Sequence, residues 1–394
     1  MKTIKRIYHW IMYVLFGAWY FILFPISFLI YGKKKIWIIS EVDFDARDNG
    51  YHFFVYLSKH HPDINTVFVI SYKNKYFDKV KALGQTIEPN SLKHWLVFIS
   101  SRVKLSTYVN GSAPSYYTQL LLKHIHPYGL NVALKHGIFK NSHPNYFCKN
   151  AHLDLICCGS PREVNFINSY FGYKKDVAKN TGLARFDNLY NKPVCDVILV
   201  MPTWRRWLDE CDSVDKFEQS IFYKKWKELL ENKVFNDCLN IYNISVVFYV
   251  HPKLNNYLNS FDFLKANQRF KILNSIDGDE MQEQIIASRL LITDYSSVFF
   301  DFSYSRKPVV FYQFDEKEYY AQHYQKGYFD YYQDGFGPVE STAKKVIEEI
   351  NKIAEKEFTL SDKYKNRIND FFSFYDSNCC ERIFNEINNL KKRR

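Results

Sequence analysis

Short apolar runs, each followed by a turn or a helical stretch, recur along most of this 394-residue chain. Runs of this length that are bounded in this way are typical of buried strands in a parallel sheet. The alternation therefore predicts an α/β fold with doubly wound sheets. A first series of predicted strands covers residues 36–40, 66–71, 103–109, 131–134 and 153–158.

The pattern pauses near Pro193 and then starts again, which divides the chain into two halves. We predict two Rossmann-like domains, over 36–190 and 191–375, followed by a basic helix or tail over 376–394. Residues from Ser361 to the end read as helical, with Ser361 as a candidate N-cap. The second series of predicted elements comprises strands over 197–201, 244–250, 290–293 and 308–312 and a helix over 217–230.

Residues 10–32 contain no Asp, Glu, Lys or Arg. About 20 apolar residues suffice for a helix to cross a bilayer, and the Trp and Tyr residues here suit its interfaces. Residues 1–35 are therefore predicted to form a membrane anchor. Basic residues flank both sides equally, so the charges give no orientation, and Pro25 also permits a kinked, re-entrant segment. A buried core helix is the less favoured alternative at this length.

Lys and Arg outnumber Asp and Glu by 53 to 42, a formal charge of +11. An excess of positive charge favours an anionic partner, but it is also explained by surface charge that only keeps the protein soluble. The basic residues are scattered apart from small clusters at 33–35 and 391–394, so no basic stripe supports nucleic-acid binding. We therefore predict a phosphate-bearing substrate and a membrane surface as partners, and no nucleic acid.

Polar side chains follow three predicted strands of the second half. The carboxyl ends of parallel strands meet at one edge of a sheet, where ligands bind. Guanidinium groups and helix starts both suit phosphate, whereas a serine pair alone is an ordinary N-cap. The interpretation therefore rests on the three strand ends taken together. These residues are Thr203, Trp204 and Arg205 after 197–201, His251 after 244–250, and Ser296 and Ser297 after 290–293.

In the first half, His136 follows a predicted strand, and Gly137 lets the backbone approach a ligand closely. An imidazole in this place can act as general base toward an acceptor hydroxyl. Arg185 lies at the junction of the two halves, where it can reach a cleft. A polar loop after the first strand either lines the acceptor side or is a solvated loop with local ion pairs. Its residues are Glu41, Arg47, Asp48 and Asn49.

The second half contains Pro202-Thr203-Trp204-Arg205, His251-Pro252, Thr293-Asp294-Tyr295-Ser296-Ser297 through Asp301, Lys307-Pro308 and Phe311-Tyr312. The first half contains His136-Gly137 and the motif over 182–187. Together these motifs resemble those of the CDP-glycerol glycerophosphotransferases, the primases and polymerases of teichoic acids and related capsular polymers. The resemblance covers roughly residues 36–375.

The resemblance implies a glycosyltransferase-B architecture, in which the first lobe presents the acceptor and the second binds a CDP-activated polyol phosphate. It implies transfer of that polyol phosphate, glycerol phosphate first of all, to a hydroxyl of a lipid-linked or polymeric glycan acceptor, with release of CMP. The reaction would serve teichoic acid or capsular polysaccharide synthesis at the cytoplasmic face of the cell membrane. His136 and His251 would be catalytic, and the donor or its phosphates would contact Arg185, Thr203, Trp204, Arg205, Ser296, Ser297 and Asp301.

One departure from the family pattern follows His136-Gly137, where Ile138-Phe139-Lys140 replaces the usual Thr-Pro and apolar residue. The lost hydroxyl points to a different polyol or acceptor. Catalysis is expected to rest on positioning and electrostatics, so no metal ion and no cofactor are predicted. Two alternatives stay open: a nucleotide-sugar glycosyltransferase of the same architecture, and a non-catalytic, membrane-tethered module that binds anionic polymer.

Overall fold

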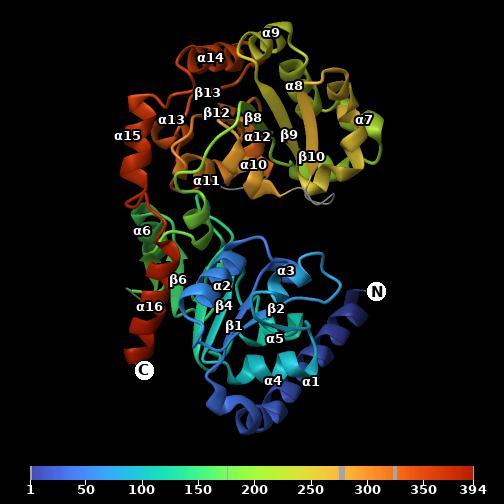
Figure 1. Ribbon diagram of the computed structural model, residues 1–394. Coiled ribbons are helices and arrows are strands. Elements are labelled where there is room, and N and C mark those ends of the chain that lie inside the picture. The colour runs from blue at the N-terminus through green and yellow to red at the C-terminus, as the bar shows by residue number, and fades with distance from the viewer. Residues whose placement is uncertain (1, 175, 275–279, 323–325, 394) are drawn as a thin grey trace. The chain divides into compact units, whose positions relative to one another are not determined.

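The computed structural model describes residues 2–174, 176–274, 280–322 and 326–393, and the chain forms two compact units. Figure 1 shows that each unit is built on one sheet with helices on both faces. The prediction of two parallel-sheet α/β domains is confirmed. The first unit takes in Met1–Phe139, His143–Asp187 and Asp376–Arg394, and the second takes in Lys140–Ser142 and Asn188–Tyr375.

Seven strands form the sheet of the first unit, in the order β3-β2-β1-β4-β5-β6-β7. Neighbouring strands are parallel, and Trp37 of β1 lies opposite both Thr66 of β2 and Val103 of β4. The strands are β1 (Trp37–Ser40), β2 (Thr66–Val69), β3 (Gln85–Ile87), β4 (Val103–Ser106), β5 (Leu130–Ala133), β6 (Leu155–Cys158) and β7 (Ala178–Asn180).

Six strands form the sheet of the second unit, in the order β10-β9-β8-β11-β12-β13. They are also parallel, and Leu199 of β8 lies opposite both Val247 of β9 and Leu291 of β11. The strands are β8 (Val197–Met201), β9 (Ser245–Val250), β10 (Phe270–Asn274), β11 (Leu290–Thr293), β12 (Val309–Tyr312) and β13 (Val339–Glu340).

Both sheets reverse their strand order beside the first strand, between β1 and β4 in one unit and between β8 and β11 in the other. Ligands of doubly wound sheets bind outside the carboxyl ends of the strands at such a reversal. All nine predicted strands are present, with ends that shift by at most three residues. The four strands that the pattern missed, β3, β7, β10 and β13, are the four edge strands.

Helices cover both faces of the first sheet because successive residues of β1 point to opposite sides. Ile39 faces α2 and α16, where it joins Phe53 and Ile383, whereas Ile38 faces α4 and joins Phe98. The helices of this unit are α1 (Lys2–Tyr31), α2 (Asn49–His60), α3 (Phe77–Lys81), α4 (Leu92–Ser100), α5 (Tyr116–Leu121), α6 (Pro161–Tyr170) and α16 (Cys379–Arg393).

The second sheet packs one face on α8, α9 and α14 through a core that includes Trp226, Leu239 and Ile350. An aromatic group around Phe299, Phe300 and Phe371 occupies another part of the unit. The helices are α7 (Val214–Gln219), α8 (Ile221–Leu230), α9 (Lys233–Ile241), α10 (Met281–Ala287), α11 (Val298–Tyr304), α12 (Glu316–Gln322), α13 (Tyr331–Asp334), α14 (Ala343–Glu355) and α15 (Asp362–Phe371).

Two predicted helices are each divided in the structure. The helix predicted over 217–230 is split because Ser220 is extended and its hydroxyl caps α8 by accepting from the Tyr223 N–H at 3.1 Å. The helical stretch predicted from Ser361 onward breaks after α15, where Phe372 is extended and its ring packs on Tyr304. Ser361 does occupy the N-cap position of α15, without a side-chain cap bond.

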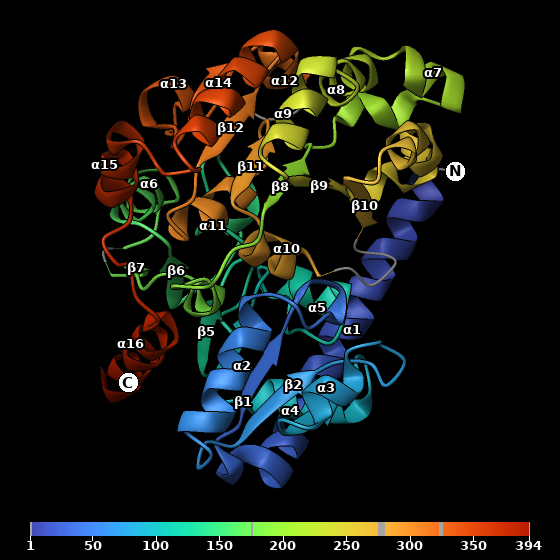
Figure 2. The same ribbon diagram turned by 45° about the horizontal axis from the view of Figure 1, so that its top comes forward.

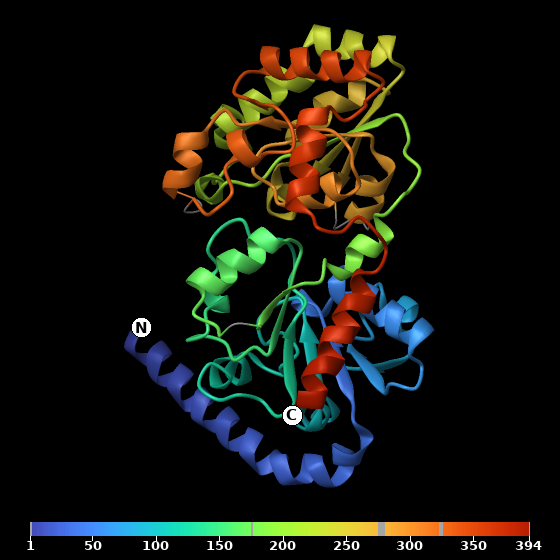
Figure 3. The ribbon, with the colours of Figure 1, turned by 90° about the vertical axis from the view of Figure 1, so that its left-hand side faces the viewer.

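The C-terminal helix α16 belongs to the first unit, where Figure 3 shows it lying over the sheet. Asp187 holds its start, because one carboxylate oxygen accepts from the Cys379 N–H at 2.7 Å and the other from the Cys380 N–H at 2.9 Å. Gly182 has a φ of +75°, and a Cβ there would lie only 2.3 Å from Sγ of Cys379. Close packing of α16 thus explains the glycine that opens the motif over 182–187.

We predict that Asp187→Ala loosens α16, because the variant loses two hydrogen bonds at the positive end of the helix. The loss should lower the free energy of local unfolding by about 1–2 kcal/mol. Hydrogen exchange of α16 amides should then be several-fold faster. Asn385→Ala, on the exposed side of the same helix, is the control and should leave exchange unchanged. Equal exchange in both variants would contradict the capping role.

Candidate active site

A carboxylate, an imidazole and a guanidinium meet at the carboxyl edge of the first sheet. Asp48 follows β1, His136 follows β5 and Arg185 follows β7. One oxygen of Asp48 lies 2.5 Å from Nδ1 of His136, and the other lies 2.6 Å from Nη1 of Arg185. The structure therefore brings the predicted residues His136 and Arg185 together through an aspartate that the sequence assigned only to a polar loop.

The charges of this group follow from burial and proximity. Burial alone would raise the pKa of the Asp48 carboxyl, but His136 and Arg185 outweigh it and lower that pKa to about 2. Burial, and then the charge of Asp48, raise the pKa of the fully buried Glu41 to about 8. Glu41 also accepts hydrogen bonds from three backbone N–H groups of the loop and of α2. Asp48 is therefore the anion of the group at neutral pH.

Buried polar contacts fix the segments that carry His136 and Arg185. The side-chain amide of Asn49 donates to the Lys135 carbonyl at 2.8 Å and accepts from the Arg185 N–H at 2.9 Å. Lys135 has a φ of +61°, which is unfavourable for a residue with a Cβ. Its ammonium pairs with Glu163, and both side chains are fully buried. These contacts hold the strained turn from which His136 projects.

The predicted residues of the second unit lie at the carboxyl ends of three adjacent strands, β9, β8 and β11. Figure 2 shows the three strands side by side. Neighbouring parallel strands end at the same edge, so these residues share one edge of the sheet at its point of reversal. They are Thr203 and Trp204 after β8, His251 after β9, and Ser296 and Ser297 after β11.

Trp204 and His251 form a stacked pair, with ring centroids 6.4 Å apart and 19° between the planes. Burial, and then the Lys253 ammonium, lower the pKa of His251, which favours the neutral ring. Nδ1 of His251 accepts from the Lys253 N–H at 3.2 Å, so the proton of the neutral ring is on Nε2. His251 therefore offers an N–H donor, which suits a phosphate oxygen.

The hydroxyl groups at this edge differ in their exposure. The Thr203 hydroxyl is buried and has no hydrogen-bond partner among residues 2–174, 176–274, 280–322 and 326–393, an arrangement that a ligand would improve. Ser296 is half-buried and accepts from the Val298 N–H at 3.4 Å, so it also serves as an ordinary cap. Ser297 is exposed, whereas Asp301 is buried in the first turn of α11.

Arg205 takes a different place from the predicted phosphate contact. Its side chain is fully buried, with Nη1 2.9 Å from Asp294 and with Nε and Nη2 donating to the two oxygens of Asp315. Nη1 also donates to the Thr203 carbonyl at 2.6 Å. Burial alone would lower the pKa of the guanidinium, but the two aspartates raise it. Because its charge is neutralised inside the protein, Arg205 joins the loops after β8, β11 and β12 and is not exposed to a ligand.

The sequence model of the CDP-glycerol:poly(glycerophosphate) glycerophosphotransferase family matches residues 22–389. The chain belongs to this family. The match includes the polar edges of both sheets, and it confirms the resemblance drawn from the sequence motifs.

Two relatives of the chain are named for teichoic acid synthesis. Over 91% of the length of this chain, the sequence is 27% identical to that of the minor teichoic acid biosynthesis protein GgaB of Bacillus subtilis. It is 31% identical to the teichoic acid poly(glycerol phosphate) polymerase of Bacillus spizizenii over 46% of its length. The matched region spans 40% of each of these two relatives.

Solved structures share the fold. The wall teichoic acid polymerase TagF superimposes with a TM-score of 0.67 and 16% identity over 99% of this chain and 98% of that chain. A putative UDP-N-acetylglucosamine 2-epimerase from Listeria monocytogenes gives a TM-score of 0.58 and 12% identity over 91% of this chain and 98% of that chain. Since proteins named for different reactions share it, the fold by itself does not select the reaction.

Lys140 occupies the place where the chain departs from the usual family motif. It is counted with the second unit, where its ammonium donates to the Tyr295 carbonyl at 2.7 Å and to the Tyr331 hydroxyl at 2.6 Å. Burial lowers the pKa of Lys140 to about 7, although the charge of Asp294 opposes this shift. The departure thus places a buried amine against the loop that leads to Ser296.

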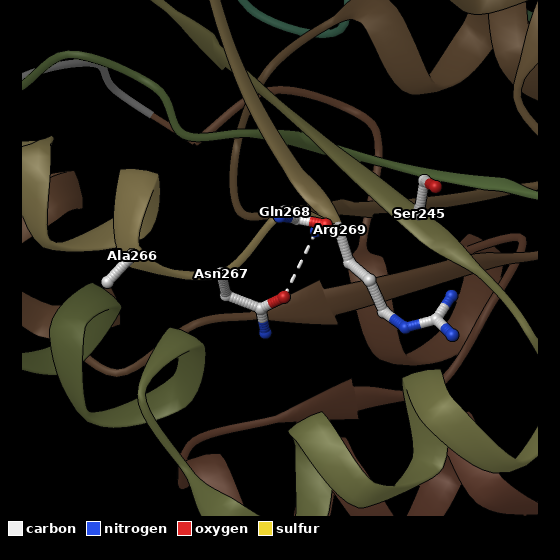
Figure 4. A pocket seen from close by; sticks show the side chains of 5 residues that line it. All are labelled: Ser245, Ala266, Asn267, Gln268 and Arg269. Carbon is white, nitrogen blue, oxygen red and sulfur yellow. Dashed lines mark hydrogen bonds between the residues drawn. The ribbon is translucent and has the colours of Figure 1, made fainter.

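A separate pocket lies at the opposite edge of the second sheet (Figure 4). The Arg269 N–H donates to Asn267 Oδ1 at 3.0 Å, and the Arg269 guanidinium donates to Asn240 and Asn243. The lining residues adjoin the amino ends of β9 and β10, where doubly wound sheets do not bind their ligands. They are Ser245, Ala266, Asn267, Gln268 and Arg269.

Three carboxylates that organise the site were not singled out for these roles from the sequence. From the sequence, Asp48 is only one polar residue of the loop over 41–50, and Asp294 is one residue of the Thr293–Ser297 motif. Asp315 is 110 residues from Arg205, and its only signal is its position just after a predicted strand. In the part of the chain that the structure describes, no cluster of three or more His, Cys, Asp or Glu side chains could hold a metal ion.

We predict that Arg205→Met destabilises the protein by about 3–5 kcal/mol, because the change leaves two buried carboxylates without their counter-charge. The neighbouring Arg206 is exposed, so Arg206→Met should change stability by less than about 0.5 kcal/mol. Urea unfolding followed by circular dichroism measures both. A loss for Arg205→Met no larger than that for Arg206→Met would show that the buried ion pairs do not hold the loops.

Proposed function

We propose that the protein transfers a polyol phosphate, glycerol phosphate first of all, from a CDP-activated donor to a hydroxyl group of a lipid-linked or polymeric glycan acceptor and releases CMP. The reaction would serve teichoic acid or capsular polysaccharide biosynthesis. The observation that carries the proposal is the family match over residues 22–389, which takes in every residue of the two polar sheet edges.

The second unit offers groups that suit the donor. His251 presents an N–H donor, the Thr203 hydroxyl lacks a partner among the described residues, and Ser297 is exposed at the start of α11. Such donors stabilise the charge of a diphosphate and of the phosphate that leaves it. The Trp204 ring supplies an apolar surface beside His251. Arg205 and Asp301 are buried, and we assign them to holding this arrangement.

The first unit offers a base for the acceptor. The acceptor oxygen would attack the distal phosphorus of the donor, and the bond from that phosphorus to the oxygen of CMP would break. CMP leaves with the bonding electrons, and the hydroxyl proton passes to His136. Arg185 lies beside this imidazole and adds positive charge. An acceptor on the first unit and a donor on the second correspond to a glycosyltransferase-B enzyme.

We predict that the purified protein releases CMP from CDP-glycerol or another CDP-polyol only when a lipid-linked acceptor is present. His136→Ala should lower turnover by about 10²–10⁴-fold, the usual contribution of a general base, with an unchanged circular dichroism spectrum. His60→Ala on the exposed side of α2 is the control and should retain full turnover. Mass spectrometry of the product identifies the polyol.

Other outcomes separate the alternatives. Release of a nucleoside diphosphate from a nucleotide sugar would establish a glycosyltransferase instead. Polymer binding without turnover of any donor would establish a binding module. Turnover should persist in the presence of a chelator, and its loss would show that the reaction needs a metal ion.

We further propose that residues 10–32 hold the protein at the cytoplasmic face of the cell membrane. By length and composition α1 could cross a bilayer, yet one of its faces packs on α4 and α5. Tyr20 and Leu23 are buried there, and the Ser27 hydroxyl donates to the Leu96 carbonyl. Figure 3 shows α1 running along one side of the first unit. Its exposed apolar side chains include Trp10, Leu15, Trp19, Phe21, Ile22 and Leu29.

A docked α1 favours binding along the membrane surface over crossing it, since crossing would strip the helix from α4 and α5. The mechanism resembles that of interfacial helices, whose affinity scales with buried apolar area and anionic lipid. Lys33 and Lys34 at the end of the helix and the net charge of +11 suit an anionic surface.

We predict that the protein sediments with vesicles rich in phosphatidylglycerol and that Trp19→Ser with Ile22→Ser weakens this binding at least tenfold. Each lost apolar side chain removes about 1.5–3 kcal/mol of burial. Ile241→Ser, at an exposed apolar position of α9, is the control and should bind normally. Resistance of the bound protein to alkaline carbonate extraction would show instead that α1 crosses the bilayer.

A further inference from the structure

Asp48 lies between two residues of the proposed reaction without being exposed itself. Its side chain is only 12% exposed, whereas that of His136 is 72% exposed. We propose that Asp48 is a positioning residue, which fixes His136 as the Nδ1–H tautomer and so makes Nε2 the proton acceptor. This role rests on the proposed function of His136 as the base.

The contact itself defines the tautomer. An ionised carboxylate can only accept hydrogen bonds, so the 2.5 Å contact between Asp48 Oδ2 and Nδ1 of His136 requires a proton on Nδ1. In a neutral imidazole the lone pair is then on Nε2. An acceptor hydroxyl that approaches this exposed ring therefore meets a base and not a second N–H donor.

The carboxylate is held in place from several directions. Oδ1 of Asp48 accepts from Arg185 at 2.6 Å and from the Asn49 N–H at 2.8 Å, and Asp48 is the N-cap of α2. Asn49 in turn ties the backbone of Lys135 to that of Arg185. A group whose orientation is fixed before the substrate arrives costs little reorganisation during the reaction.

His251 has the opposite arrangement, which supports separate roles for the two imidazoles. A backbone N–H donates to Nδ1 of His251, whereas a carboxylate accepts from Nδ1 of His136. Nε2 is therefore a donor in His251 and an acceptor in His136. One ring suits the leaving phosphate and the other suits the attacking hydroxyl.

Removal of the negative charge of Asp48 should also shift the pH profile of kcat/KM. The titratable and charged groups that face Asp48 are Glu41 after β1, His136 after β5, Arg185 after β7 and the more distant phenol of Tyr146. Without Asp48, an imidazolium at His136 would lose the carboxylate that faces it and would remain beside Arg185. The imidazole would then lose its proton at a lower pH, and the acidic limb of kcat/KM would shift to lower pH.

The activity test uses Asp48→Asn in the 394-residue chain, with CDP-glycerol and a lipid-linked acceptor. Asparagine can still cap α2, but its amide can donate to Nδ1 and favour the wrong tautomer. We expect kcat to fall by about 10²–10⁴-fold, as for other histidines that lose an orienting aspartate, with little change in KM for the donor. Asp48→Glu keeps the charge and should recover part of the loss.

The chain supplies a matched control in a second Asp–His pair of the same unit. Asp154 lies 3.1 Å from Nε2 of His126 and directly precedes β6, at the opposite edge of the sheet. Asp154→Asn should leave kcat and its pH profile unchanged. A loss of activity in Asp154→Asn equal to that in Asp48→Asn, or a loss confined to KM, would overturn the positioning role.

A measurement that does not depend on turnover completes the test. In ¹⁵N-histidine spectra of the wild-type protein, the signal that disappears in His136→Gln should have the shifts of an Nδ1–H imidazole, and it should change to Nε2–H in Asp48→Asn. An Nε2–H ring in the wild type would overturn the proposal even if the Asp48 variants failed to fold, because the assignment needs only a folded His136→Gln. Absence of CMP release from the wild type would instead remove the proposed function and leave the tautomer result standing.

Discussion

A buried cation holds the loops of the second unit in place. Arg205 after β8 lies between Asp294 after β11 and Asp315 after β12, so a single guanidinium connects three strand ends. The Tyr295 ring centroid is 4.8 Å from the guanidinium carbon, and Tyr295 stacks on Tyr319 with centroids 3.7 Å apart. Charges removed from water depend on their partners for stability. The half-buried Trp204 and the exposed Ser297 therefore project from a frame that is fixed underneath.

In the first unit a charge of the opposite sign, a carboxylate, holds the groups at the sheet edge in the way that Arg205 does in the second unit. There a buried anion, Asp48, lies under an exposed imidazole and beside a guanidinium, and a strained residue is held by a buried ion pair. In both units the polar groups at the sheet edge are supported by residues with little exposure of their own. Such an arrangement restricts the motion of the exposed groups, and it explains why the supporting charges are as close to the strand ends as the groups they support.

The sequence predicted the central strands well and the edge strands poorly, for one reason. Central parallel strands are buried on both faces and read as apolar runs, whereas β7 (Ala178–Asn180) and β13 (Val339–Glu340) are short and partly polar. The strand ends also located His136, His251 and the serines, because parallel strands place such residues at one edge. The sequence did not predict which oppositely charged residue pairs with each charged side chain of the site. Arg205 reads equally well as a phosphate ligand or as a buried clamp until Asp315 is seen beside it.

The path of the chain makes the two units interdependent. From the first unit the chain enters the second at Lys140–Ser142 and returns to the first at His143. After Asp187 it enters the second unit again, and at Asp376 it returns to the first unit to form α16. Ile383 and Ile387 of that last helix are part of the core of the first unit. A fragment that stops near residue 190 would thus expose an apolar face and lack its own final layer. Residues 188–375 of the second unit are, in genetic terms, an insertion within the first unit, so an exchange of the second unit between enzymes would require grafting at both ends of this segment together with residues 140–142.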